Sequence, residues 1–330
     1  MPTNDVVILC SRGSSGGEEA LHQLCDAMIG AGVRVRLLYC PFSRKNERPA
    51  KFAHYRGAQI TRAEVPEGAL IVIPEVYTWL VGEFPRSPIV IWWLSVDNYR
   101  GSKSLRYAVG NGFFGRRYLG PERLRGHERV ALHLAQSLYA LDFIERHAFE
   151  PRAWLSDYIG EAFLAAGPRV DPTRKDDIVL YNPAKLTAPA RRFIEGEGAF
   201  RFQPIAGLTE YEVIDLLARA KVHIDFGTHP GKERIPREAA TMGCCVLTNR
   251  RGSAPSDVLI PEMYQLDDDA PDFAARAHDL VSRVLDDFPT HHAALASYRA
   301  AVAAERESFL SEAAPVFSGL LGPTGALPAW

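Results

Sequence analysis

A strand, a polar loop, a short helix and a second strand follow one another over Val222–Thr248, and no other stretch of the chain constrains the fold as strongly. Val222–Phe226 alternates apolar and polar residues and is rich in β-branched side chains, which predicts a strand. Proline suits the first turn of a helix and glycine the left-handed position that ends one, so the sequence predicts a helix over Pro236–Met242 that stops at Gly243. The apolar run Cys244–Leu247 predicts the second strand. This order of elements is typical of a parallel α/β sheet.

The loop before this helix carries groups that bind anions. His229, Gly231, Lys232 and Arg234 lie within nine residues that end at the predicted helix. Unpaired N–H groups and the positive end of a helix dipole favour phosphate at a helix N-terminus, and the two cations would add charge-assisted hydrogen bonds. A solvated, charged surface loop explains the same residues equally simply. The loop sequence alone leaves both interpretations open.

The segment GKERIPREAATMGCCVLT resembles the signature of nucleotide-sugar-dependent glycosyltransferases of the GT-B fold, especially the retaining family with an E-x7-E motif. Glu238 matches the second glutamate of that motif, which in the family binds the ribose hydroxyls of the donor nucleotide. The first glutamate, which in the family contacts the donor sugar, is not matched, because Pro230 stands at its position. His229 lies beside that position, so it is expected either at the sugar end of the donor or simply as a residue that shapes the turn.

The resemblance implies an α/β fold with two Rossmann-like domains facing a cleft. A chain of 330 residues is long enough for two domains of about 150 residues each. The stretch Ala165–Lys175 is rich in proline and charge, as linkers are. We therefore expect an acceptor-side domain over residues 1–168 and a donor nucleotide-binding domain over 169–300. A helical tail over 301–330 is expected to cross back to the first domain.

The expected first domain contributes three candidate positions. Gly16 and Gly17 belong to a glycine-rich turn between a predicted strand and helix, and the resemblance places them near the donor phosphates and the acceptor; a tight turn that needs glycine is the alternative. Glu75 follows the predicted strand Leu70–Ile73 at its carboxyl end, where open α/β sheets bind ligands. Asp97 follows the next predicted strand, and either helix capping or catalysis accounts for it.

The expected second domain contributes the donor site. Lys185 follows the predicted strand Ile178–Tyr181, and the resemblance gives a basic residue there the donor pyrophosphate; a surface lysine is the alternative. We expect Lys185, Lys232 and Arg234 to converge on one diphosphate and to stabilise it as it leaves. Gly252 and Ser253 lie in a turn after the strand that ends at Thr248, and their N–H groups could contact a phosphate.

Composition excludes several other classes of protein. The net charge of −2 gives no basic field for nucleic acid. We expect a cytoplasmic protein without a transmembrane segment, because no apolar run reaches the roughly 18 residues that span a bilayer and Met1–Asp5 does not resemble a signal peptide. The five cysteines have no zinc spacing and are expected to be reduced, buried and inert. Asp267–Asp269 fits a D-x-D pattern, but a charged turn before the predicted helix Phe273–Leu285, which complements the helix dipole, explains it without a metal.

These expectations lead to a metal-independent, hexosyltransferase-like enzyme that uses a nucleotide sugar as donor substrate and needs no other cofactor. The acceptor is not identified by the sequence. A basic stretch predicts an anionic acceptor, although a solvated face accounts for the same arginines: Arg116, Arg117, Arg123, Arg125 and Arg129. A sugar-nucleotide epimerase or phosphorylase on the same fold, or a nucleotide-binding protein without catalysis, remain alternatives.

Overall fold

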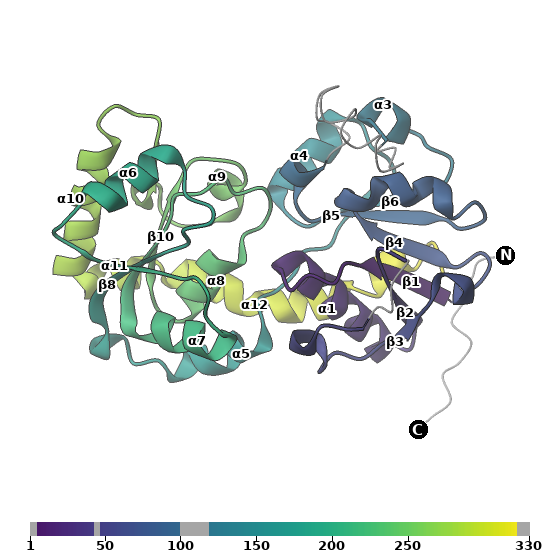
Figure 1. Cartoon of the computed structure of the whole chain (residues 1–330), viewed down its shortest axis with the longest axis horizontal. Helices are drawn as coiled ribbons and strands as arrows, with labels where there is room; N and C mark the ends of the chain where they lie inside the picture. The colour runs from purple at the N-terminus through teal and green to yellow at the C-terminus, as the bar shows by residue number, and fades with distance from the viewer. Residues whose placement is uncertain (1–4, 43–46, 100–118, 322–330) are drawn as a thin grey trace. The chain divides into compact units, whose positions relative to one another are not determined.

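The computed structural model describes residues 5–42, 47–99 and 119–321. The chain forms two compact units, one made of Met1–Asp157 with Glu307–Trp330 and the other of Tyr158–Arg306. Each unit contains one parallel sheet flanked by helices (Figure 1). The limits differ from the expected domains, because residues 158–168 and 301–306 belong to the second unit. Phe163 packs into the core of that unit, so the chain enters it before the proline-rich stretch that was expected to be the linker.

The sheet of the first unit has seven parallel strands in the order β3-β2-β1-β4-β5-β6-β7. Its central strands are continuous buried apolar runs, as expected for a parallel sheet covered on both faces. The short edge strand β3 has no such pattern, and the sequence did not predict it. The strands are β1 (Asp5–Cys10), β2 (Arg34–Tyr39), β3 (Ala58–Ile60), β4 (Leu70–Pro74), β5 (Ile89–Trp93), β6 (Val130–Ala135) and β7 (Arg152–Trp154).

The helices of the first unit begin at local signals in the sequence. Ser15 and Glu18 form a capping box at the start of α1, and the Ser137 hydroxyl accepts a hydrogen bond from the Ala140 N–H at the start of α4. The α-helices are α1 (Gly16–Gly30), α3 (Pro121–Leu124) and α4 (Leu138–Arg146). The 3₁₀ turns are η1 (Ala50–Phe52), η2 (Arg62–Glu64), η3 (Glu75–Glu83), η4 (Val96–Asn98) and η9 (Pro315–Phe317).

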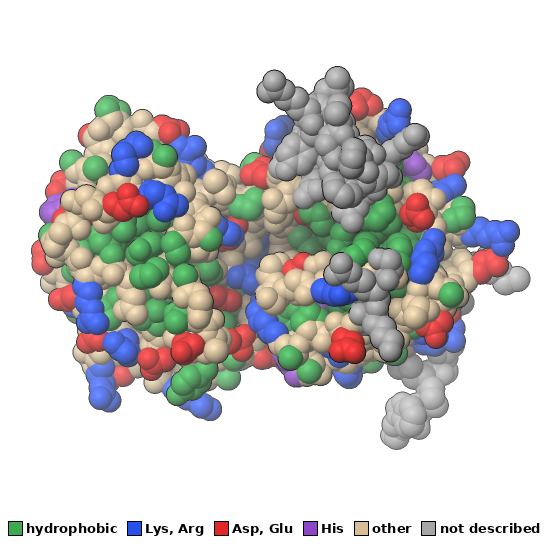
Figure 2. Space-filling model, in the orientation of Figure 1, with side chains coloured by type: hydrophobic (Ala, Val, Ile, Leu, Met, Phe, Trp, Pro, Cys, Tyr) green, Lys and Arg blue, Asp and Glu red, His purple; other side chains and the backbone are tan. Residues whose placement is uncertain are grey.

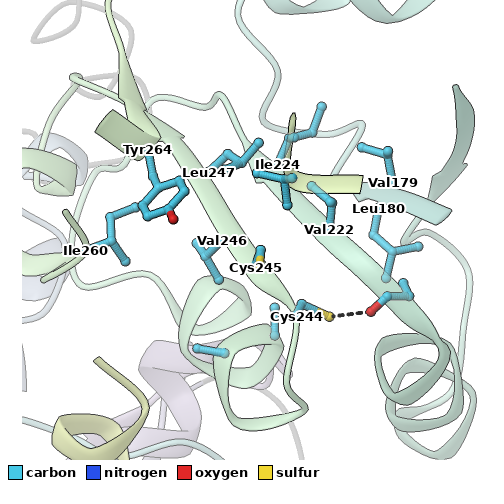
Figure 3. Packing of buried hydrophobic residues seen from close by; sticks show 14 of the residues in the cluster. Val179, Leu180, Val222, Ile224, Cys244, Cys245, Val246, Leu247, Ile260 and Tyr264 are labelled. Atoms are coloured by element: carbon cyan, nitrogen blue, oxygen red, sulfur yellow. Dashed lines mark hydrogen bonds between the residues drawn. The ribbon is translucent and has the colours of Figure 1, made fainter. Parts of the chain in front are cut away.

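The sheet of the second unit has five parallel strands in the order β12-β11-β10-β8-β9. The strands are β8 (Asp176–Tyr181), β9 (Arg201–Pro204), β10 (Ala220–Asp225), β11 (Cys245–Asn249) and β12 (Gln265–Leu266). Figure 3 shows the core packing around the middle strands, with labelled side chains that include Val179, Leu180, Val222, Ile224, Val246 and Leu247. All five cysteines of the chain are buried as free thiols, as expected.

The helices of the second unit are mostly short. Thr209 and Glu212 form a capping box at the start of α7, and Gly243 follows α8 with a left-handed φ of 77°. The helices are α5 (Glu161–Ala166), η6 (Gly167–Arg169), η7 (Pro172–Arg174), α6 (Ala188–Gly196), α7 (Glu210–Arg219), α8 (Arg234–Thr241), α9 (Ala254–Asp257), η8 (Glu262–Tyr264), α10 (Phe273–Asp286) and α11 (Phe288–Ala294). Helix α12 (Ala296–Glu312) begins in this unit, and its residues from Glu307 on belong to the first unit.

Strand order identifies one position in each sheet where a ligand is expected. The first sheet has the 3-2-1-4-5-6 order of dinucleotide-binding folds, and the second has the 2-1-3-4-5 order of flavodoxin-like folds. In such sheets the order in which successive strands are added reverses at a switch point. The loops on its two sides diverge there and leave a crevice at the carboxyl ends of the strands. The switch points lie between β1 and β4 and between β8 and β10.

Two surface properties bear on the classes that composition excluded. Acidic and basic side chains are interspersed over the visible face of each unit (Figure 2), in keeping with the net charge of −2. Among the described residues, no helix combines the length and the apolar character that crossing a membrane requires.

Candidate functional site

The loops that follow β8 and β10 lie against each other at the switch point of the second unit. A Cβ built on Gly227 would stand 3.2 Å from the Lys185 carbonyl oxygen, and the Thr187 N–H donates to the Phe226 carbonyl at 3.1 Å. The ammonium of Lys185 pairs with the carboxylate of Glu233. Lys185 therefore reaches the loop that carries Lys232 and Arg234, although about fifty residues separate them in the sequence.

Helix α8 begins at this edge, two residues earlier than the predicted Pro236. Its first residue is Arg234 and its N-cap is Glu233, whose side chain does not cap the helix but pairs with Lys185. Burial raises the pKa of the Glu233 carboxyl, while Lys185 acts in the opposite direction. A carboxylate thus stands beside a helix N-terminus and a lysine, which is the environment that favours a bound anion.

The cations of the loop have fixed partners within the unit. Lys232 Nζ lies 2.8 Å from one carboxylate oxygen of Glu305, and Arg237 lies 2.7 Å from the other. Arg234 donates to the Tyr158 carbonyl at 2.7 Å. The Lys232 side chain is only 12% exposed. These contacts rule out the solvated-loop interpretation, and they include Arg237 and Glu305, which carry no local signal in the sequence.

The structure places His229 inside the turn and not at an exposed surface. Its side chain has no exposed area, and its backbone has a left-handed φ of 45°. The carbonyl of Asp225 lies 2.9 Å from Nε2, and because a carbonyl only accepts, Nε2 carries the proton. The Nδ1 atom faces an Asp225 carboxylate oxygen at 3.9 Å. His229 shapes the turn, which was the second of the two expected roles.

The turn after β11 packs against the same loop. The predicted phosphate contact of Ser253 therefore needs correction, whereas that of the Gly252 N–H stays a prediction. The Ser253 N–H donates to the His229 carbonyl at 3.0 Å, and its hydroxyl donates to the Gly231 carbonyl at 2.5 Å. Both donors of Ser253 are therefore used inside the protein. Gly252 has a φ of 51°, and a Cβ there would stand 2.1 Å from the His229 carbonyl oxygen. Its role is to let two backbones approach.

Glu238 lies half-buried on α8, in the middle of the helix. Its own carbonyl accepts the hydrogen bond from the Met242 N–H that helps to end the helix. The side chain is thus presented by the same short helix whose N-terminus faces the Lys185 loop. Its assignment to a ribose stays a prediction.

The three aspartates Asp267–Asp269 hold their ligand atoms within 4.8 Å of one another. The helix that follows begins at Phe273, so the aspartates precede it, and their effect on its dipole stays a prediction. Arg251 supplies the balancing charge: it contacts Asp268 at 2.7 Å and Asp269 at 2.5 Å. Thr187 also donates to Asp268, at 2.6 Å. The aspartates therefore join the loops after β8 and β11 to the segment after β12.

A pocket of about 180 Å³ lies at the switch point of the first unit. Gly17 lines it from the first turn of α1, and Gly16 begins that helix. Glu18 also lines it and accepts hydrogen bonds from Ser11 and Ser15. The sequence placed the two glycines at this edge but did not single out Glu18, because a capping-box glutamate has a structural explanation of its own.

The carboxyl group of Glu75 is buried at this pocket and has a raised pKa. It is 2% exposed and accepts a hydrogen bond from the Leu94 N–H at 2.8 Å. Burial raises its pKa to about 7, because the charged form is poorly solvated there. Perturbed carboxyl groups in concave sites are candidates for function. Its position at a strand end was visible in the sequence, but its burial was not.

Glu75→Gln is expected to flatten the pH dependence of stability. The folded protein holds the Glu75 proton up to about pH 7, against an ordinary pKa of 4.5, so the free energy of unfolding falls as the pH rises from 4.5 to 7. The loss above pH 7 is on the order of 3 kcal/mol. Glutamine is neutral and can still accept a hydrogen bond from Leu94. The free energy of unfolding of the variant should therefore rise relative to that of the parent between pH 5 and pH 8. Denaturant titrations at the two pH values measure these free energies. A difference between variant and parent that is the same at pH 5 and pH 8 contradicts the prediction.

Asp97 and the basic stretch lie outside this pocket's described lining. Asp97 is exposed in η4, whose N-cap is Ser95, so it does not cap that turn. Its carboxylate accepts a hydrogen bond from the Tyr139 hydroxyl at 2.9 Å. Arg123 and Arg125 are exposed, as a solvated face requires. Arg116 and Arg117 lie outside the described residues.

Comparisons with known proteins identify the fold. No protein-family model matches the chain, and no curated protein matches it significantly. Similar solved structures include sucrose-phosphate synthase from Thermosynechococcus elongatus, with a TM-score of 0.62, 14% identity and coverage of 96% of this chain and 98% of that one. Anabaena HepE in complex with UDP-glucose gives a TM-score of 0.62 at 13% identity, covering 96% and 99%. A glycosyltransferase from Rickettsia africae gives 0.63 at 9% identity, covering 98% and 100%.

Sequence identities this low establish the fold and not the activity. The two parallel sheets of seven and five strands match the two-domain GT-B architecture of these structures, which confirms the expected fold class.

Proposed function

We propose that this protein transfers a sugar from a nucleotide-sugar donor to an acceptor. The observation that carries the proposal is the switch point of the second unit, where Lys185, the N-terminus of α8 and Glu238 belong to adjoining loops and one short helix. Open α/β sheets bind ligands at this position. The fold is shared with sucrose-phosphate synthase and with HepE, whose structure contains UDP-glucose, which supports a nucleotide-sugar donor here.

In this mechanism the second unit binds the nucleotide, with Glu238 accepting hydrogen bonds from the ribose hydroxyls. The diphosphate takes the place beside the α8 N-terminus and Lys185, where the Glu233 carboxylate now supplies the negative charge. Lys185 must therefore exchange Glu233 for phosphate when donor binds. As the bond to the sugar breaks, negative charge develops on the diphosphate, and preorganised donors there stabilise it. Lys232 and Arg234 add positive charge, so the proposal requires no metal ion.

A nucleotide-binding protein without transfer activity is the second candidate. It is favoured by the residues that replace the first glutamate of the motif, since Pro230 has no acidic group and His229 is buried. This candidate predicts nucleotide binding without slow hydrolysis of any sugar nucleotide. Product analysis after long incubation separates the two candidates.

Nucleoside diphosphates and their sugar conjugates are expected to stabilise the protein, and the parent nucleosides much less. A ligand at 100 times its dissociation constant adds about 2.7 kcal/mol to the free energy of unfolding. Thermal-shift titrations with uridine, UDP and UDP-sugars, and with the other bases, measure this directly. If no nucleotide of the panel shifts the melting temperature, the proposed function is wrong.

Lys185→Ala is expected to weaken diphosphate binding about tenfold. A charged hydrogen bond is worth about 1.5 to 3 kcal/mol, but the variant no longer has to break the pair with Glu233 before it binds, which offsets part of the loss. Lys221→Ala is the matched control, because Lys221 pairs with Asp177 and lies near the amino end of β10 in the same unit. Equal losses of diphosphate affinity in both variants would show that Lys185 does not contact the diphosphate.

The location and the acceptor belong to the proposal as well. We propose a cytoplasmic enzyme, because cytoplasmic pools supply nucleotide sugars to soluble glycosyltransferases. The sequence predicted an anionic acceptor from the basic stretch. The pocket of the first unit supports a different acceptor chemistry.

A further inference from the structure

The pocket at the switch point of the first unit is built from three strand ends. The loop after β1 and the start of α1 form one side, the residues after β4 form the second, and those after β5 form the third. Its volume of about 180 Å³ is smaller than the roughly 300 to 1,000 Å³ of sites that enclose drug-sized ligands. The pocket therefore suits a single small ring and not a nucleotide.

The polar groups that line this pocket are acidic or neutral. Its described lining contains two carboxyl groups, Glu18 and Glu75, and no lysine, arginine or histidine. The remaining polar residues can donate or accept hydrogen bonds without carrying charge: Ser11, Ser15, Tyr77, Ser95 and Asn98. Leu21, Val76 and Leu94 add apolar surface. Hydroxyl and amide groups beside carboxylates are suited to a ring that carries several hydroxyl groups.

Both carboxyl groups also hold the protein together, but these bonds do not use them fully. Glu18 accepts from Ser11 and from the backbone and hydroxyl of Ser15. Glu75 accepts from the backbone N–H groups of Leu94, Ser95 and Glu75 itself. Two carboxylate oxygens together offer about four acceptor positions. Structural bonds explain why these side chains are fixed, and they do not explain why the space between them is left open.

The charge of the lining selects against anions. A phosphate or carboxylate on the ligand would face Glu18 at short range, with no described cation in the lining to balance it. Like charges placed together across a binding surface cost several kcal/mol. An amino group would meet the opposite situation, because a carboxylate pairs with it.

We propose that this pocket binds a hydroxyl-rich ring without negative charge, as a neutral or amino-substituted monosaccharide unit of the acceptor. That the ligand is the acceptor rests on the proposed function, whereas the pocket and its selectivity do not. The proposal replaces the anionic acceptor that the basic stretch predicted.

The test uses the full chain and a panel of hexoses that differ in ring stereochemistry. Each hexose is supplied in neutral, 2-amino-2-deoxy and 6-phosphate forms, and ligand-observed NMR measures binding. We expect at least one neutral or amino form to bind, and its phosphate form to bind at least tenfold more weakly. Phosphate forms that bind as tightly as their neutral counterparts overturn the proposal, and so does a panel in which no member binds.

Two variants locate the ligand and its selectivity. Gly17→Leu should abolish hexose binding by filling the pocket, and it should fold, because a Cβ at Gly17 meets only ordinary contacts at 3.7 and 3.9 Å. Glu18→Gln retains the capping box, since glutamine serves at that position, and should reduce the discrimination against the phosphate form about tenfold. A purely structural Glu18 would lower the melting temperature and leave the ligand order unchanged, which contradicts the proposal.

The outcome is separate from that of the proposed function. Hexose binding without any nucleotide binding would support the proposed ligand of the pocket and contradict the proposed glycosyl transfer. Nucleotide binding and transfer to an anionic acceptor would support the proposed function and contradict the proposed selectivity of the pocket.

Discussion

Gly252→Ala is expected to lower the free energy of unfolding by more than about 3 kcal/mol, the largest stability effect that we predict for a single methyl group. The new Cβ would stand 2.1 Å from the His229 carbonyl oxygen and 2.5 Å from that of Thr228. Both neighbours are backbone atoms, so they cannot swing aside as a side chain would. The loop of residues 227–233 would have to move away from the turn after β11, and the hydrogen bond from the Ser253 N–H to His229 would break.

Gly207→Ala is the matched control for this variant. Gly207 also has a left-handed φ, of 69°, but a Cβ there would meet nothing within 4 Å. It should therefore lose only the roughly 1 to 2 kcal/mol of backbone strain. Denaturant unfolding of both variants measures the difference, which isolates the clash. Equal losses would show that the two loops are not packed as described.

Glu238→Gln is expected to weaken nucleotide binding by roughly 1 to 3 kcal/mol, or about 5- to 150-fold, because a charged acceptor is removed from a hydrogen bond to the ribose. Glutamine keeps the size and the helix propensity of glutamate, so α8 should remain folded. Calorimetric titration with a nucleoside diphosphate measures the change. The substitution should affect mostly the contact with the ribose hydroxyls. The affinity for a 2′-deoxy nucleotide should therefore fall much less than that for the ribonucleotide.

Glu210→Gln serves as the control for this comparison, because Glu210 lies exposed in the first turn of α7 in the same unit. A melting temperature that falls in Glu238→Gln without any loss of nucleotide affinity would indicate a structural glutamate. In that case the resemblance would fail at the residue that matches the family motif best.

Local rules account for what could be predicted of the fold. The strands of both sheets, apart from the short edge strands β3, β7 and β12, are apolar runs or alternate in sequence, so their pattern is visible without a partner. Helix ends depend on residues within one turn. For this reason Gly243 acts as predicted, and Ser137 and the pair Thr209 and Glu212 cap α4 and α7 with local hydrogen bonds. The fold class follows from this alternation of strands and helices.

The candidate site was only partly visible. The sequence put Lys185 and the loop of residues 227–235 at carboxyl strand ends, and parallel strands gather these ends at one edge. It could not show that Glu233 would pair with Lys185, or that Glu305 would hold Lys232, because such pairs join residues 48 and 73 positions apart. Nor could it show the burial of Glu75, on which the raised pKa depends.

The sequence by itself determined most of the strands and longer helices, where several helices begin and end, and which residues lie at the strand ends, because these properties depend on neighbours within a few residues. The tertiary structure decided what those residues do. It buried His229 against the Asp225 carbonyl, used both donors of Ser253 inside the protein, and set Arg251 against Asp268. Burial and pairing are set by segments distant in sequence, and they determine whether a polar group is free to meet a ligand.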